Sequence, residues 1–195
     1  MMLQELASLY YNQGIILAGD NRMTTAIDRL ENAVVLDPTD WKAWNVLGLC
    51  LYQLGEFDKA KKAWEKSIDN HREDNPALEY LDKLKSPEFN SICQCYNRAL
   101  EAAKQEDYRG AVKIMLGNKK GIPSFVFYLN LLGLCLYGSG RRARARMMWK
   151  KALELDKDHP DAQNYIIQSL RAYPSILIEL WRKFKNLFLF RQRRV

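Results

Sequence analysis

Apolar residues recur at three- and four-residue intervals along most of this chain, a period that places an apolar stripe on each of a series of helices. The clearest example is the 34-residue stretch 41–74. Its two helix-period segments, residues 41–54 and 57–70, meet at Gly55, which is free to take a positive φ where the chain reverses. Small Gly48 lies where two helices must approach closely. The pattern predicts a helical hairpin.

The spacing of bulky and small residues in this hairpin resembles that of the tetratricopeptide repeat, which has a 34-residue period. The matching residues include Trp44, Leu47, Gly48, Ala60 and Trp64. The resemblance implies an all-α, right-handed superhelical solenoid of antiparallel helix pairs. It also implies a non-catalytic interaction module in which the first helix of each pair lines a concave face.

The same pattern occurs four times, at residues 7–40, 41–74, 92–125 and 126–159, and extra helices are expected at 75–85 and 160–172. The second and fourth copies align without a gap at an offset of 85 residues, and the extra helices keep this offset. We infer a duplication of residues 1–85 and 86–170. Residues 1–172 are therefore predicted to form one solenoid domain, followed by a separate C-terminal segment, residues 173–195.

Residues at helical spacing on the first helices are predicted to line a groove that binds a peptide or protein segment. They are Tyr11, Asn45, Leu49, Tyr52, Tyr96, Leu100, Asn130, Leu134 and Tyr137, with Ile15 beside them. Amides hydrogen-bond to a peptide backbone, and tyrosines add apolar area with a polar tip. Helix packing explains the same residues equally well, so both interpretations remain open. Because of the duplication, the groove should present similar chemistry twice.

The segment 173–195 predicts an amphipathic helix that is apolar on one face and basic on the other. Its candidate contacts with an anionic surface are Trp181, Arg182, Lys183, Phe184, Phe188, Arg191, Arg193 and Arg194. Three alternatives remain: the helix packs on the solenoid or in its groove, lies on the anionic inner face of a membrane, or mediates self-association.

Charge is concentrated in two places. Of the net charge of +7, residues 174–195 hold +5, from six basic residues and one acidic residue. A second cluster follows Gly140 and consists of Arg141, Arg142, Arg144, Arg146, Lys150 and Lys151. It is either a solvated helix face or a docking patch for acidic protein, phospholipid or nucleic acid. No nucleic-acid-binding motif accompanies it, so nucleic acid is the least favoured partner.

Catalytic chemistry has little support in the sequence. The histidines His71 and His159 lie at repeat ends, and no Cys or His cluster has the spacing of metal ligands. Cys50 and Cys135 occupy identical apolar contexts, which predicts buried thiols. We therefore expect no enzyme activity, no cofactor and no metal. The predicted function is a protein-interaction adaptor in a reducing cytoplasm. The alternatives are a peripheral membrane protein that recruits a partner and, less favoured, an RNA-associated accessory factor.

Overall fold

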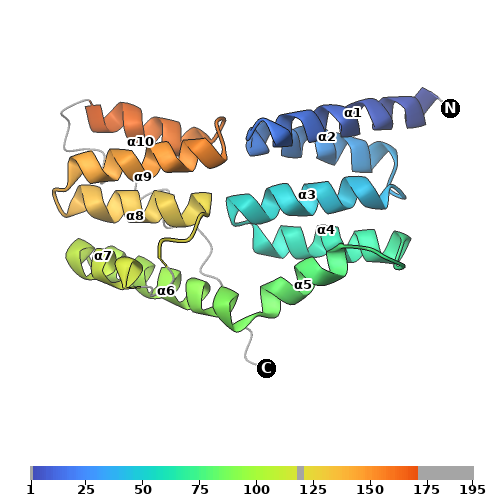
Figure 1. Ribbon diagram of the computed structural model, residues 1–195. Helices are drawn as coiled ribbons and strands as arrows, with labels where there is room; N and C mark the ends of the chain where they lie inside the picture. Colours follow the sequence, from blue (N-terminus) through green and yellow to red (C-terminus); the bar gives the residue numbers. More distant parts are fainter. Residues whose placement is uncertain (1, 118–120, 171–195) are drawn as a thin grey trace. The chain divides into compact units, whose positions relative to one another are not determined.

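The computed structural model describes residues 2–117 and 121–170, and within these ranges all regular elements are helices (Figure 1). The helices are α1 (Met2–Gly19), α2 (Met23–Leu36), α3 (Trp41–Leu54), α4 (Phe57–Asn70), α5 (Ala77–Lys85), α6 (Pro87–Lys104), α7 (Tyr108–Leu116), α8 (Val126–Gly138), α9 (Arg142–Leu155) and α10 (Pro160–Leu170). The prediction of an all-α chain built from helical hairpins is confirmed. None of the described helices is long and apolar enough to span a bilayer.

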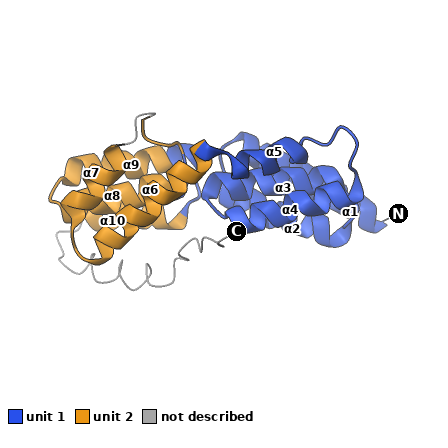
Figure 2. Cartoon of the chain, turned by 90° about the horizontal axis from the view of Figure 1, so that it is seen from below, with its two compact units in different colours: residues 1–87, 125–127, 153–159 blue, residues 88–124, 128–152, 160–195 orange. Residues whose placement is uncertain are grey.

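The chain divides into two compact units (Figure 2). Unit 1 comprises residues 1–87, 125–127 and 153–159, and unit 2 comprises residues 88–124, 128–152 and 160–195. Two short stretches that the repeat pattern assigns to the third and fourth copies, residues 125–127 and 153–159, thus belong to unit 1. Helices α1 and α6 begin at Met2 and Pro87, earlier than the repeats predicted from residues 7 and 92.

Unit 1 is built around close helix approaches at small residues. A Cβ added to Gly14 would lie 2.6 Å from Cγ of Leu30, and one added to Gly48 would overlap the indole of Trp64. Leu30 and Trp64 are fully buried, because these glycines allow their side chains to lie directly on the neighbouring helix backbone. The close approach predicted at Gly48 is therefore present.

The turn between α3 and α4 has the predicted geometry. Gly55 has a φ of 96°, and its N–H donates to the carbonyl oxygen of Leu51 at 3.1 Å, which closes the end of α3. Beside this turn, the rings of Tyr52 and Phe57 each contact Phe125, with centroids 5.2 and 5.8 Å apart. Phe125 therefore extends the aromatic core of unit 1.

Unit 2 also has a glycine packed against a buried tryptophan of the neighbouring helix, and its central helix, α8, is more apolar than those of unit 1. A Cβ on Gly133 would overlap the indole of Trp149, which is fully buried. Residues 128–136 of α8 are all buried, so burial extends around its whole circumference. Such a helix is apolar on every side rather than along one stripe. Tyr128 is the first residue of this buried stretch, and its hydroxyl donates a hydrogen bond to the carbonyl oxygen of Met115 at 2.8 Å. The buried phenol therefore has a hydrogen-bond partner.

Candidate protein-interaction surface

The accessible part of the predicted groove lies on α1 and α3 of unit 1. Ile15 and Leu49 occupy equivalent positions one repeat apart, and they are 41% and 39% exposed. Tyr11 and Tyr52 are half-buried beside them, each packed against the core of unit 1. Because equivalent positions of successive repeats face the same way, these residues form one surface, which we call the α1/α3 surface.

The α1/α3 surface is apolar with neutral polar tips. Burial, and secondarily the charge of Asp40, raises the pKa of the Tyr11 phenol, so this hydroxyl stays protonated and remains a hydrogen-bond donor. Ile15 and Leu49 supply apolar area without hydrogen-bonding groups. The surface can therefore contact an apolar peptide side chain and donate a hydrogen bond to a carbonyl oxygen nearby.

Asn45, a predicted groove residue, is buried beneath the start of α5. Its Nδ2 donates to Oδ1 of Asn75 at 2.9 Å, and the same Oδ1 accepts the N–H of Ala77 at 2.9 Å. Asn75 Nδ2 in turn donates to Oγ of Ser67 at 2.9 Å and to the carbonyl oxygen of His71 at 2.6 Å. Asn45 thus joins α3 to α5, and the packing interpretation applies to it.

The second half of the predicted groove is not exposed. Tyr96, Leu100 and Leu134 are 2%, 1% and 5% exposed, and Asn130 is 8% exposed. The predicted repetition of the groove therefore fails at Tyr96, Leu100 and Leu134, whose counterparts in unit 1 are half-buried or exposed, whereas Asn130 is buried like its counterpart Asn45. The reason is the apolar surroundings of α8, where a Leu position that is exposed in α3 becomes part of the core.

Tyr137 is the one predicted groove residue of unit 2 that reaches the surface, since it is half-buried. The Tyr137 ring centroid lies 6.0 Å from the ring centroid of Trp149. The Arg142 guanidinium carbon lies over the Tyr137 ring, 5.6 Å from its centroid. This cation over an aromatic ring is a favourable contact that covers part of the phenol. The predicted contacts in residues 173–195 lie outside the described residues.

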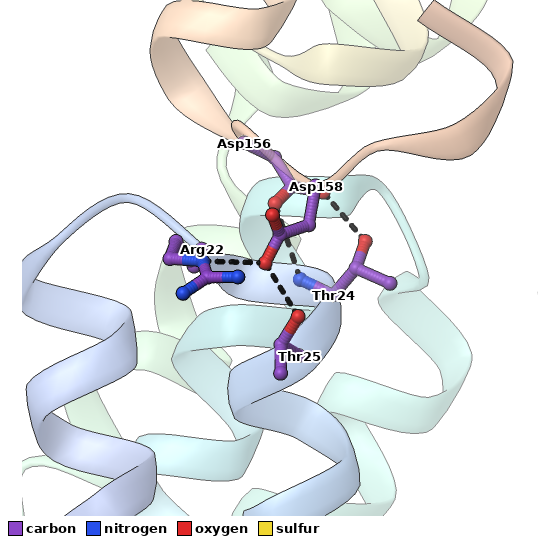
Figure 3. A network of polar contacts seen from close by, with 5 residues as sticks. All are labelled: Arg22, Thr24, Thr25, Asp156 and Asp158. Atoms are coloured by element: carbon purple, nitrogen blue, oxygen red, sulfur yellow. Dashed lines mark hydrogen bonds and ion pairs between the residues drawn. The ribbon is translucent and has the colours of Figure 1, made fainter. Parts of the chain in front are cut away.

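A polar network that sequence reasoning missed lies at the start of α2 in unit 1 (Figure 3). Helix α2 has no side-chain cap of its own, and the buried carboxylate of Asp156 replaces one. Its Oδ1 accepts the N–H of Thr24 at 3.2 Å, and its Oδ2 accepts the Thr24 hydroxyl at 2.6 Å. A carboxylate at a helix N-terminus satisfies a free N–H and interacts favourably with the helix dipole.

Asp158 forms the second half of this network. Its Oδ2 accepts from Nε of Arg22 at 2.8 Å and from the Thr25 hydroxyl at 2.5 Å (Figure 3). These hydrogen bonds, from Thr25 first and Arg22 second, lower the pKa of the Asp158 carboxyl. The segment 153–159 is thereby tied to α2 by charged and neutral donors, which is a structural role rather than a catalytic arrangement.

Metal or thiol chemistry has no assembled centre in the part of the chain that the structure describes. No group of three or more His, Cys, Asp or Glu side chains there is placed to hold a metal ion. Desolvation raises the pKa of the Cys50 and Cys135 thiols to about 12 each, which keeps them protonated. The prediction of buried thiols at these two positions is confirmed.

Comparisons with known proteins identify the repeat. Residues 41–74 match the tetratricopeptide repeat family. The tetratricopeptide domain of P58(IPK) superposes with a TM-score of 0.60 at 17% identity, covering 96% of this chain and 52% of that one. The chain thus spans about half the length of that domain. No curated protein matches the sequence.

Two further solved structures are similar to this chain at lower TM-scores. The pilF protein of Pseudomonas aeruginosa has a TM-score of 0.37 at 16% identity, covering 94% of this chain and 77% of its own. YrrB, described as a tetratricopeptide protein with an unusual peptide-binding site, has a TM-score of 0.36 at 18% identity. The match covers 80% of this chain and 89% of the YrrB chain.

Proposed function

We propose that this chain, in which residues 41–74 are a tetratricopeptide repeat and whose fold is that of tetratricopeptide proteins, is an adaptor that binds a partner segment on the α1/α3 surface. Tetratricopeptide folds in general support protein–protein interaction and are typically non-catalytic. The finer proposal concerns where the partner binds and what chemistry it offers.

The observation that supports this site is the matched exposure of Ile15 and Leu49 at equivalent positions of two successive repeats. Large apolar side chains at regular spacing along one face can receive alternate apolar side chains of a partner, while Tyr11 donates to its backbone. The surface carries no requirement for a charged partner. We therefore propose an apolar peptide segment of another protein as the ligand.

Capture from an extract of the source cells tests this proposal, followed by rebinding with each purified candidate. The intact chain should retain a partner that Ile15→Asp with Leu49→Asp loses by roughly tenfold or more, because two carboxylates would be desolvated in an apolar contact. The matched control is Ile16→Asp with Val35→Asp, which changes side chains that are 66% and 75% exposed elsewhere on α1 and α2. A partner lost equally from both variants would contradict the proposed site.

Peripheral membrane binding through residues 173–195 is a second proposal, supported by their amphipathic sequence pattern and net positive charge. In this version the chain is cytoplasmic, and the segment lies on the anionic inner face of a membrane while the repeats recruit a partner. Sedimentation with phosphatidylserine vesicles compares the full chain with a chain ending at Ala172. Equal partitioning of the two would exclude a membrane role for the segment.

A further inference from the structure

The outer face of α9, in unit 2, carries a dense positive charge. Residues 141–154 contain six basic residues and one acidic residue, Glu154, for a net charge of +5. The buried side of the helix is formed by Ala145, Met148, Trp149 and Ala152. The basic residues are Arg141, Arg142, Arg144, Arg146, Lys150 and Lys151, and all are exposed except Arg146, which is half-buried. The charge cluster that the sequence singled out is thus a solvent-facing surface, which we call the α9 basic face.

Helix α4 of unit 1 is equivalent to α9 by the 85-residue offset, and its charges show that the fold does not require a net positive charge on this helix. Residues 56–69, at the offset of 85 residues, contain four basic and four acidic residues. Three ion pairs link them: Lys59 to Glu56 at 3.5 Å, Lys61 to Glu65 at 3.6 Å and Lys66 to Asp69 at 4.0 Å. In unit 2, Arg141 and Lys150 stand where Glu56 and Glu65 stand in unit 1.

As a result, the cations of the α9 basic face have no acidic partner among residues 2–117 and 121–170. None of the six forms an ion pair with any residue that the structure describes. Arg142 and Arg146 are four residues apart in α9, as are Arg146 and Lys150. Like charges at this helical spacing destabilise the helix. The face therefore carries a repulsion that an anionic partner would relieve.

We propose that the α9 basic face binds an acidic helical segment of another protein. Arg144 and Lys151 lie seven residues apart on one side of the helix, which separates them by about 10.5 Å along the axis. Met147 lies between them and is 49% exposed. The complementary helix has carboxylates two turns apart with an apolar residue between them. Arginine favours carboxylates because its planar guanidinium donates two parallel hydrogen bonds.

Other anionic partners fit this face less well. A helix that lies in a membrane surface buries several large apolar side chains, whereas Met147 is the one large apolar side chain among the exposed residues of α9. Single-stranded nucleic acid is bound by stacking on aromatic rings, and the one aromatic residue of α9, Trp149, is buried. The chain's own residues 174–195 carry a net charge of +5, so they would be repelled.

The charge pattern of α4 supplies the test. Arg141→Glu with Lys150→Glu gives the α9 basic face the acidic positions of α4, and both changes are at exposed residues where ion pairs can form. The matched control, Lys62→Glu with Lys113→Glu, changes net charge by the same amount at exposed lysines of α4 and α7. Fluorescence anisotropy in about 0.15 M salt, where exposed charges are partly screened, measures binding of the full-length chains.

The probe is a labelled alanine-based helical peptide with glutamates seven residues apart and a leucine between them; a peptide of the same composition in scrambled order is the reference. We expect the Arg141→Glu, Lys150→Glu variant to bind the ordered peptide roughly tenfold more weakly, and the control variant to bind it almost normally. Ile15→Asp with Leu49→Asp should leave this binding unchanged, so the two proposed sites fail or succeed separately.

The proposal would be overturned by equal weakening in both charge variants, by equal binding of the ordered and scrambled peptides, or by no binding of the ordered peptide. Tighter binding of phosphatidylserine vesicles or of poly(U) that is lost in the Arg141→Glu, Lys150→Glu variant would also overturn it, in favour of a lipid or nucleic-acid surface.

Discussion

A glycine beneath an indole ring sets how closely the two helices of a hairpin approach in each unit. The Trp64 indole N–H donates to the carbonyl oxygen of Asn45 at 3.3 Å, and the Trp149 indole N–H donates to that of Asn130 at 3.4 Å. Both indoles reach the facing backbone because Gly48 and Gly133 have no side chain there. The pair Gly and Trp therefore combines tight packing with a satisfied buried donor.

Gly48→Ala should lower the free energy of unfolding by about 1–3 kcal/mol, because the added methyl group overlaps the Trp64 ring in a packed core. Urea denaturation followed by tryptophan fluorescence measures the loss. Gly19→Ala is the control, since a Cβ at Gly19 meets nothing within 4 Å. Equal stability of the two variants would mean that the close approach at Gly48 is not tight in solution.

Thr24→Val should also destabilise unit 1, by about 1–3 kcal/mol, because it removes a hydroxyl donor from the buried Asp156 carboxylate. The shape of the side chain is preserved, so the effect reports the hydrogen bond. Thr39→Val is the matched control, since its hydroxyl donates to Asp37 in an exposed turn. The first change should lower the urea midpoint clearly more than the second, and the reverse order would contradict a capping role for Asp156.

Asp158 makes a pH-dependent contribution. Its pKa is lowered in the folded state, so its interactions stabilise the fold above the unfolded value of about 3.9 and are lost as pH falls through the lower folded value. Asp158→Asn should therefore reduce the melting temperature at pH 7, and the difference from the parent chain should shrink as pH falls below about 4. Thermal circular dichroism between pH 3 and 7 tests this, and a difference independent of pH would contradict it.

At the scale of elements, α5 depends on a side chain that precedes it. The amide of Asn75 accepts the Ala77 N–H and the Asn45 amide while donating to Ser67 and His71. The sequence pattern predicts an extra helix at residues 75–85. The structure begins α5 at Ala77, and the Asn75 side chain accepts the Ala77 N–H at this end of the helix.

Asn75→Ala should release the start of α5, because it leaves buried polar groups on α3 and α4 without partners at a cost of about 1–3 kcal/mol for each buried group. Hydrogen exchange should show faster exchange in residues 77–85 than in the rest of unit 1. Asn32→Ala is the control, since the Asn32 amide makes an exposed hydrogen bond to the carbonyl oxygen of Asp28 within α2. Uniform protection in both variants would mean that α5 is held by its apolar contacts alone.

These elements also show which features a single sequence reveals. Local spacing predicts the bounds of α3 and α4 and the positive φ at Gly55, because those depend on neighbouring residues. Whether Asn45 is accessible depends on Asn75, which is 30 residues away, and the Asp156 contact with Thr24 spans 132 residues. Helical period shows which residues share a face but does not show what covers that face, and for this reason Ile15 and Leu49 are exposed while Leu134, at the equivalent position of its own repeat, is buried.

At the scale of the whole molecule, each compact unit contains one deeply buried thiol. Cys50 belongs to unit 1 and Cys135 to unit 2, and both are at most 2% exposed. Burial raises the pKa of each thiol to about 12, with the charge of Asp156 adding to the effect at Cys50. Because the thiolate is the reactive form, alkylation near pH 8 requires that the surrounding unit open.

We therefore expect the two cysteines to report separately on the two units. Gly48→Ala should speed iodoacetamide labelling of Cys50 but not of Cys135, and Gly133→Ala should do the opposite, because each change weakens the core around one thiol. Mass spectrometry of the labelled peptides at pH 8, over a series of urea concentrations below the main transition, measures both rates in one sample. Equal acceleration of both cysteines by either change would show that the units open together, whereas separate acceleration would show that each compact unit is its own cooperative unit of unfolding.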